Sequence, residues 1–262
     1  MASPIITITA IASLLGFISN STILYLVLSQ RKKLYHLLFA GLALTCAIWD
    51  LGIFLAMIRN SHPGELIVYG YIATTPASFI LAFVHHFSVS YTGMRVRWSV
   101  ILIWGISIVM ILLTGLGYYG RLEGIYQYSW GNIFKVVQSP VVNPLIFVVW
   151  FAVMLSSVWI LLRGRRSSTE PLERRHFNYI IAGFLAITTA VVKVVIVMGI
   201  DIPFVLPLGM ILNDTFAALI GIAIVKDRLL DITVIIKKGA LYSALAGLVV
   251  FVFSFSEHIF AT

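Results

Sequence analysis

The stretch "LLFAGLALTCAIWDLGIFLAM", residues 37–57, contains a single charged residue, Asp50, among side chains that are almost all apolar or small. A helix needs about 20 predominantly apolar residues to cross the hydrocarbon core of a bilayer, and this stretch has that length. The whole chain has the same character, because 60% of its residues are hydrophobic, 11% are charged and the mean hydropathy is +1.03. These values lie far from those of soluble proteins, so we expect an integral membrane protein.

Other runs of comparable length lie on either side of this one, at residues 5–28, 67–91, 99–118, 142–162, 177–199 and 203–225. A further run at 240–255 is shorter and marginal for a span. Runs this long, without period-two alternation, favour helices over membrane strands. The predicted fold class is therefore all-α integral membrane, with a seven-transmembrane helical bundle (1–225), a cytoplasmic interfacial connector (226–239) and an eighth membrane helix (240–262).

The positive charges predict how this bundle is oriented. If the seven runs span the membrane, Lys193 lies within a span and one side holds only Arg59, Arg121 and Lys135. Every other Lys and Arg lies on the opposite side, and short cytoplasmic loops retain such residues. We therefore expect an extracytoplasmic N-terminus. The net charge of +8 then reflects topology and attraction to anionic membrane lipids, so no nucleic acid partner is expected.

The sequence contains no motif of a known catalytic site. It has no Gly-rich phosphate loop, no H-E-x-x-H zinc spacing and no nucleophile elbow. Its lone cysteine, Cys46, is too few for a thiolate metal site. We expect this chain to be no enzyme and to hold no metal and no cofactor.

Ionisable residues inside the predicted spans are the strongest functional signal, because each is costly there unless it is paired or hydrated. At 1.5 Å per residue, Asp50 and Lys193 each lie about 10 Å from the outer end of their runs, whereas Asp214 lies deeper. Depth predicts an Asp50–Lys193 ion pair, with Asp214 at a longer reach. Two interpretations stay open: with Asn213 and Trp49 these residues line an outward-facing polar cavity whose occupancy shifts helix packing, or they form a structural ion pair that fixes helix register.

His85 and His86 are secondary candidates. Adjacent residues point about 100° apart on a helix, so the two imidazoles cannot chelate one metal, and we expect one to face the bundle and the other its rim. Packing is favoured over a role as ligand or proton relay. Pro76 is expected to kink the third run and Pro207, with Gly209, the seventh.

Two segments outside the spans also carry predictions. The outer loop 118–140 is rich in Tyr, which indicates an aromatic belt at the membrane surface or, alternatively, a lid over a ligand. The connector "KDRLLDITVIIKKG", residues 226–239, follows both a strand-like and a helical apolar pattern, and we favour a short amphipathic helix or turn at the inner leaflet. Signal transmission is assigned to its charged residues Asp227, Arg228, Asp231, Lys237 and Lys238.

Several stretches, in their order and spacing, carry a family resemblance. They are Asn20 in the first run, "SQRKK" (29–33), "FAGLALTCAIWDLGIFLAM" (39–57), "SFILAFVHHFSVSYTG" (78–93), "YSWG" (128–131) and "PLGMILNDTFAALIGIAIVKDRLLDITVIIKKGALYSAL" (207–245). Together they resemble the N-terminal seven-transmembrane sensor region of bacterial and archaeal histidine kinases, over nearly the whole chain.

The resemblance implies a signal-input module of a two-component system, multi-pass in a prokaryotic plasma membrane. In this family cytoplasmic GAF, PAS or kinase domains follow, so an output domain, a homodimeric state and an unidentified small ligand or stimulus are implied. The eighth run is typical of a hairpin that the family completes with a ninth, so we expect a fragment. The alternative is a transporter or ion-handling protein that uses Asp50, Lys193 and Asp214. A retinal pump is disfavoured, because Lys193 lies in the sixth run and the seventh has no interior lysine.

Overall fold

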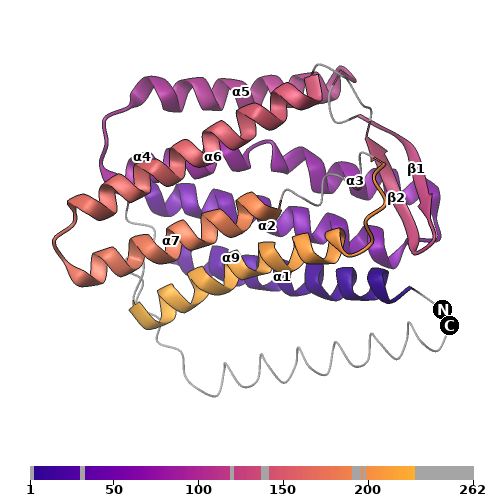
Figure 1. The fold of residues 1–262 in the computed structure, drawn as a ribbon, viewed down its shortest axis with the longest axis horizontal. Coiled ribbons are helices and arrows are strands. Elements are labelled where there is room, and N and C mark those ends of the chain that lie inside the picture. The colour runs from indigo at the N-terminus through magenta and orange to yellow at the C-terminus, as the bar shows by residue number, and fades with distance from the viewer. Residues whose placement is uncertain are drawn as a thin grey trace.

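The helices run roughly along one axis and a β-hairpin covers one end of the bundle (Figure 1). The computed structural model describes residues 3–29, 33–118, 121–136, 142–190, 196 and 199–227. Its helices are α1 (Pro4–Ser29), α2 (Leu34–Ile58), α3 (Pro63–Ala77), α4 (Ile80–Thr92), α5 (Arg97–Gly115), α6 (Val142–Ser167), α7 (Pro171–Ala190) and α9 (Val205–Asp227), and its strands are β1 (Leu122–Tyr128) and β2 (Gly131–Val136).

The predicted apolar runs coincide with these helices to within a few residues. Six helices within the described ranges are long and apolar enough to cross a membrane, with α3 and α4 counted together as Gly64–Thr92. The sixth predicted run, 177–199, falls on α7, but most of its second half lies outside the described residues, as do the expected connector from residue 228 onward and the expected eighth helix. The all-α membrane fold is thus confirmed, and the number seven and the orientation stay predictions.

Two prolines behave differently from one another. Pro76 lies inside the last turn of α3, which ends at Ala77. The chain then makes a tight turn in which the Phe79 N–H donates to the Pro76 carbonyl at 2.9 Å before α4 begins. The predicted kink in the third run is confirmed. The kink predicted at Pro207 is wrong, because α9 continues from Val205 to Asp227 without a break. Pro207 lies in the first turn, where a helix needs no N–H donor.

The outer loop forms a structure that the sequence analysis did not predict. Strands β1 and β2 pair antiparallel, and they lie at the end of the bundle where α1 begins (Figure 1). Asn60, just beyond α2, exchanges three hydrogen bonds of 2.7–2.8 Å with Asn132 of β2. The Leu122 N–H donates to the hydroxyl of Tyr71 on α3 at 3.0 Å. The hairpin is therefore fastened to α2 and α3 rather than merely lying on the membrane surface.

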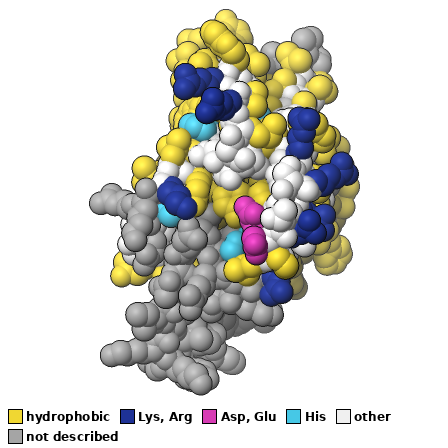
Figure 2. Space-filling view, turned by 90° about the vertical axis from the view of Figure 1, so that its left-hand side faces the viewer, with side chains coloured by type: hydrophobic (Ala, Val, Ile, Leu, Met, Phe, Trp, Pro, Cys, Tyr) yellow, Lys and Arg dark blue, Asp and Glu magenta, His cyan; other side chains and the backbone are white. Residues whose placement is uncertain are grey.

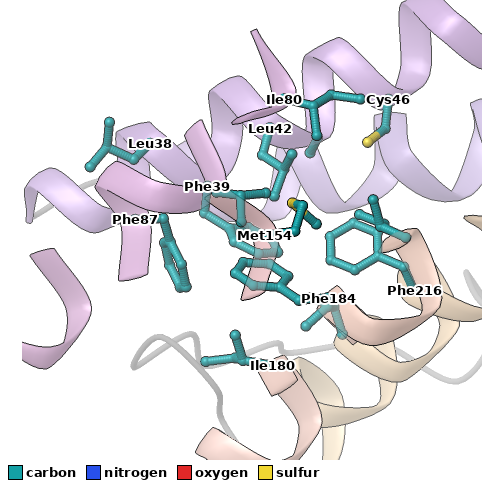
Figure 3. Close-up of a cluster of buried hydrophobic side chains, with 14 of the residues drawn as sticks. Leu38, Phe39, Leu42, Cys46, Ile80, Phe87, Met154, Ile180, Phe184 and Phe216 are labelled. Atoms are coloured by element: carbon teal, nitrogen blue, oxygen red, sulfur yellow. The ribbon is translucent and has the colours of Figure 1, made fainter. Parts of the chain in front are cut away.

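Two separate clusters of buried apolar side chains fill the bundle. We call one cluster the inner core, because it lies towards the end predicted to be cytoplasmic, and the other the outer core; Figure 3 shows part of the inner core. The inner core joins α2, α4, α7 and α9 through four fully buried rings, Phe39, Phe87, Phe184 and Phe216. The centroids of neighbouring rings lie 5.2–6.3 Å apart. The outer core combines helix residues such as Met57 and Met210 with Ile133 and Phe134 of the hairpin. Trp49 packs against both cores.

The two ends of the bundle differ in charge. Figure 2 views the end opposite the hairpin, where basic side chains gather. The described residues in the turns and helix ends on that side are Lys33, Arg95, Arg97, Arg163, Arg165, Arg166, Arg174 and Arg175. The hairpin end has Arg59, Arg121 and Lys135 among its described residues. The structure thus gathers at one end the basic loops that the sequence predicts to be cytoplasmic.

Candidate functional site

A buried polar layer lies where α1, α2 and α9 meet. It consists of Asn20, Asp50, Asn213 and Asp214 around Gly16, and we call it the polar layer. Asp50 is completely buried, and each of its carboxylate oxygens accepts an amide N–H. Asn20 Nδ2 donates to Asp50 Oδ2 at 2.9 Å, and Asn213 Nδ2 donates to Asp50 Oδ1 at 2.8 Å. The consecutive helices α1 and α2 and the distant helix α9 are joined through this one side chain.

Gly16 brings the second carboxylate into the polar layer. A Cβ atom built on Gly16 would lie 2.7 Å from Asp50 Oδ2 and in direct contact with Asp214 Oδ1. The oxygens of the two aspartates therefore converge on the same point of α1, in space that only glycine leaves open. The sequence analysis compared the reach of Asp50 and Asp214 to Lys193 and did not predict that the two aspartates lie side by side.

The buried face of α1 is small and polar. Thr9, Ser13 and Asn20 are each 0% exposed, and with Gly16 they follow one another at spacings of four, three and four residues, which place them on one side of the helix. The hydroxyls of Thr9 and Ser13 donate to the carbonyls four residues earlier, both at 2.7 Å. Small and polar side chains typically line contacts between membrane helices. The sequence analysis missed this stripe, although its spacing was visible; of its members only Asn20 was noted.

The polar layer separates the two cores. On α2, Cys46 belongs to the inner core and Ile53 to the outer one, with Asp50 between them. On α9, Met210 and Phe216 enclose Asn213 and Asp214 in the same way. At 1.5 Å per residue, Asp50 lies about 12 Å from the end of α2 and Asp214 about 13 Å from the start of α9, which is near the middle of a bilayer core.

The structure thus brings together three predicted site residues, Asp50, Asn213 and Asp214, and places Trp49 between the cores beside them. The predicted ion pair with Lys193 lies outside the described residues, as do the transmission residues Arg228, Asp231, Lys237 and Lys238 and the side chain of Asp227.

The two histidines pack against different neighbours. His85 is 3% exposed and connects three helices, because its Nε2 lies 3.0 Å from Ser99 Oγ of α5 and its Nδ1 3.2 Å from Ser157 Oγ of α6. His86 is half-buried and accepts a 3.2 Å hydrogen bond at Nδ1 from Trp104 Nε1. The expectation that one faces the bundle and the other its rim is confirmed. Within the described residues, no three His, Cys, Asp or Glu side chains are grouped so that they could hold a metal ion.

The hairpin also contacts the segment that precedes α9. Tyr128 donates to the carbonyl of Ile196 at 2.9 Å, and Trp130 Nε1 donates to Asp201 Oδ1 at 2.7 Å. The rings of Tyr126, Tyr128 and Trp130 stack in series, with centroids 5.8 and 5.1 Å apart. Burial, with smaller contributions from Tyr126 and Asp201, raises the pKa of the Tyr128 hydroxyl above its ordinary value. Ile196 is fully buried in the outer core, three residues beyond Lys193 in the chain.

The fold and the polar layer define a multi-pass α-helical membrane protein that carries charged groups at mid-depth. A comparison with family models matches residues 9–233 to the N-terminal 7TM region of histidine kinase, and the chain belongs to this family. It is therefore a sensor region, separate from the kinase domain. The matched residues include the polar layer, the whole inner core and all of the buried outer core except Ile6. A search of curated proteins gives no match.

Proposed function

We propose that this chain is the signal-input module of a histidine-kinase-type protein and that the polar layer is its switch. A stimulus from outside or from the membrane changes how α1, α2 and α9 pack at Asp50. The change passes along α9 into the connector 226–239 and then to a cytoplasmic output domain. The observation that carries the proposal is the hydrogen bonding of Asn20 and Asn213 to the two oxygens of Asp50 between two separate cores.

A polar layer is suited to switching because its hydrogen bonds are directional. Apolar side chains in a core tolerate small shifts at little cost, whereas a buried amide that loses its carboxylate partner costs about 1–3 kcal/mol. The layer therefore favours discrete arrangements over gradual ones. A stimulus selects between two arrangements only if it binds them with different affinity, and each 1.4 kcal/mol of difference shifts the populations about tenfold.

The neighbours of the polar layer support coupling in both directions. Towards the outer end, Met210 belongs to the same core as the hairpin residues Ile133 and Phe134, so a displacement of the hairpin acts on α9. Towards the inner end, Phe216 follows Asp214 by two residues and contacts Phe39 of α2 and Phe184 of α7. A shift of α9 at Asp214 is thereby passed to the inner helices.

The surface is suited to lipid. Large apolar side chains on α5 are widely exposed, among them Trp98 (83%), Ile101 (60%) and Leu102 (63%). Membrane lipids cover this face in the proposed arrangement, and the basic end of the bundle meets the anionic inner leaflet of the plasma membrane. The N-terminus is then extracytoplasmic. The full-length protein is proposed to act as a homodimer.

The test joins the chain in frame to a histidine kinase catalytic region and measures autophosphorylation in nanodiscs. Asp50→Asn, Asp214→Asn and Lys193→Met are compared with Glu123→Gln, an exposed carboxylate on the hairpin that serves as the matched control. We expect these three substitutions to change kinase activity about tenfold while the protein remains folded, and the control to leave it unchanged.

Two results would oppose the proposal. If folded variants keep the original kinase activity, the polar layer is not the switch. If the variants lose folding and none that folds alters activity, the layer is a structural ion-pair network. A flux assay in sealed vesicles addresses the alternative function, since ion uptake that depends on Asp50 identifies a transporter, whereas a sensor binds its stimulus without flux.

A further inference from the structure

One buried acceptor in the polar layer has no hydrogen-bond donor among the residues that the structure describes. Asn20 is 0% exposed, and its Nδ2 donates to Asp50, which directs the amide into the layer. Its Oδ1 is buried and has no hydrogen-bond partner among the described residues. A buried carbonyl oxygen in this situation costs about 1–3 kcal/mol unless a donor or a cation satisfies it.

The polar layer also holds carboxylate oxygens of the kind that bind a cation. The carboxylates of Asp50 and Asp214 converge at Gly16, and the Asn20 amide bonds the same Asp50 oxygen that faces Gly16. Carboxylate and amide oxygens are hard ligands, which suit alkali and alkaline-earth cations rather than transition metals. The polar layer therefore offers side-chain oxygens from α2 (Asp50) and α9 (Asp214) in addition to Asn20 of α1.

The charges favour a monovalent cation. The predicted spans contain two aspartates, Asp50 and Asp214, and one lysine, Lys193, and their formal charges leave one negative charge in the interior of the membrane. An unbalanced charge there costs several kcal/mol, and one monovalent cation removes the imbalance. The close approach of the two carboxylates at Gly16 favours the smaller Na⁺ over K⁺.

We propose that the polar layer binds Na⁺ through Asp50, Asp214 and the Oδ1 of Asn20. The cation joins α1, α2 and α9 and reduces the repulsion between the two carboxylates, so it stabilises one packing of the bundle. That Na⁺ also controls output rests on the proposed sensor function, whereas its binding does not.

Binding is tested on the chain itself in nanodiscs. The melting temperature is measured as choline chloride is replaced by NaCl or KCl at constant ionic strength, and ²³Na relaxation reports bound ion directly. We expect the melting temperature to rise with Na⁺ concentration until it saturates, and K⁺ to produce the same rise only at about tenfold higher concentration or more. An equal response to choline, Na⁺ and K⁺ overturns the proposal.

Substitutions then locate the ion. Asp214→Asn, Gly16→Ala and Asn20→Ala are expected to weaken Na⁺ binding at least tenfold, while Glu123→Gln and Gly221→Ala, whose new Cβ meets nothing within 4 Å, keep it. A response retained in all three layer variants places the ion elsewhere and overturns the proposal. If the unaltered chain does not respond but Lys193→Met does, the lysine ammonium is the resident cation and the proposal is wrong.

The same preparations separate this inference from the proposed function. In the kinase fusion, a Na⁺-dependent melting temperature without any change of activity supports the cation site and opposes the switch. Altered activity in folded Asp50→Asn and Asp214→Asn variants, without any Na⁺ response of the unaltered chain, supports the switch and overturns the cation site.

Discussion

Gly16→Ala is the sharpest perturbation of the polar layer, because it adds one methyl group at the point where the two carboxylates meet. The new Cβ would lie 2.7 Å from Asp50 Oδ2 and 2.9 Å from Asp50 Cγ, and it would also contact Asp214 Oδ1. All three contacts are closer than normal van der Waals separation. The aspartates must therefore move, and the hydrogen bonds from Asn20 and Asn213 must lengthen or break.

The magnitude follows from opposing terms. Alanine is favoured over glycine within a helix by about 1 kcal/mol, which acts to stabilise the variant. Forcing a methyl group into a filled site costs about 1–3 kcal/mol, and disturbing hydrogen bonds to a charged acceptor adds about 1.5–3 kcal/mol for each bond lost. With one of these hydrogen bonds lost, we expect Gly16→Ala to lower the free energy of unfolding by about 1.5–5 kcal/mol.

Gly221→Ala on α9 is the matched control, because its Cβ enters open space and only the propensity term remains. Its effect should lie between zero and about 1 kcal/mol of stabilisation. The assay is reversible unfolding of both variants in bicelles under identical conditions. If Gly16→Ala is as stable as Gly221→Ala, the carboxylates do not converge at Gly16 and the geometry argued for the polar layer is wrong.

Three further predictions concern the contacts around the site. Gly52→Ala should destabilise the bundle more than Gly16→Ala, because its Cβ would lie 2.6 Å from the backbone nitrogen of Ala73, which cannot rotate away. The same unfolding assay compares the two variants. Equal stabilities would contradict the close approach of α2 and α3. Asn132→Ala removes the hydrogen bond from the Asn132 side chain to the Asn60 carbonyl and should lower the free energy of opening the hairpin by about 1–2 kcal/mol. Hydrogen exchange should show faster amide exchange in β1 and β2 and unchanged exchange in α4. The raised pKa of Tyr128 means that the stability contributed by its protonated hydroxyl is complete below about pH 10 and is lost as the pH rises through the raised value. Trp130 fluorescence should therefore report loosening of the hairpin at alkaline pH, and Tyr128→Phe should abolish that step; an unchanged alkaline transition in the variant would exclude Tyr128 as its origin.

Features that depend on neighbouring residues alone were predictable. The opposite environments of His85 and His86 follow from the 100° rotation per residue of a helix, whatever the rest of the bundle does. The interruption of the helix around Pro76 follows from its missing N–H and from the clash of its ring with the preceding turn. The error at Pro207 has the same origin, because the effect of a proline depends on its distance from the start of the helix, and the predicted start was two residues too early.

The β-hairpin escaped prediction for a different reason. Its strands are short, and besides pairing with each other they are held by hydrogen bonds from α3, from Asn60 just beyond α2 and from the segment before α9. An isolated two-stranded hairpin is marginally stable in water, so its local pattern is weak. The aromatic residues were noted as a belt or lid, and the structure shows them stacked against the end of the bundle.

The sequence by itself determined that this is an integral membrane protein, where its helices lie along the chain and that its basic residues gather at alternate loops. It could do so because hydrocarbon thickness and charge act on each segment separately. Only the tertiary structure decided that Asp50 meets Asp214, Asn20 and Asn213 at Gly16. Depth along a helix is one coordinate, which the sequence supplies. Which helices are neighbours, and how each is rotated about its axis, depends on packing. In the folded bundle α9 lies against α1, although almost 150 residues separate α2 from α9 in the chain.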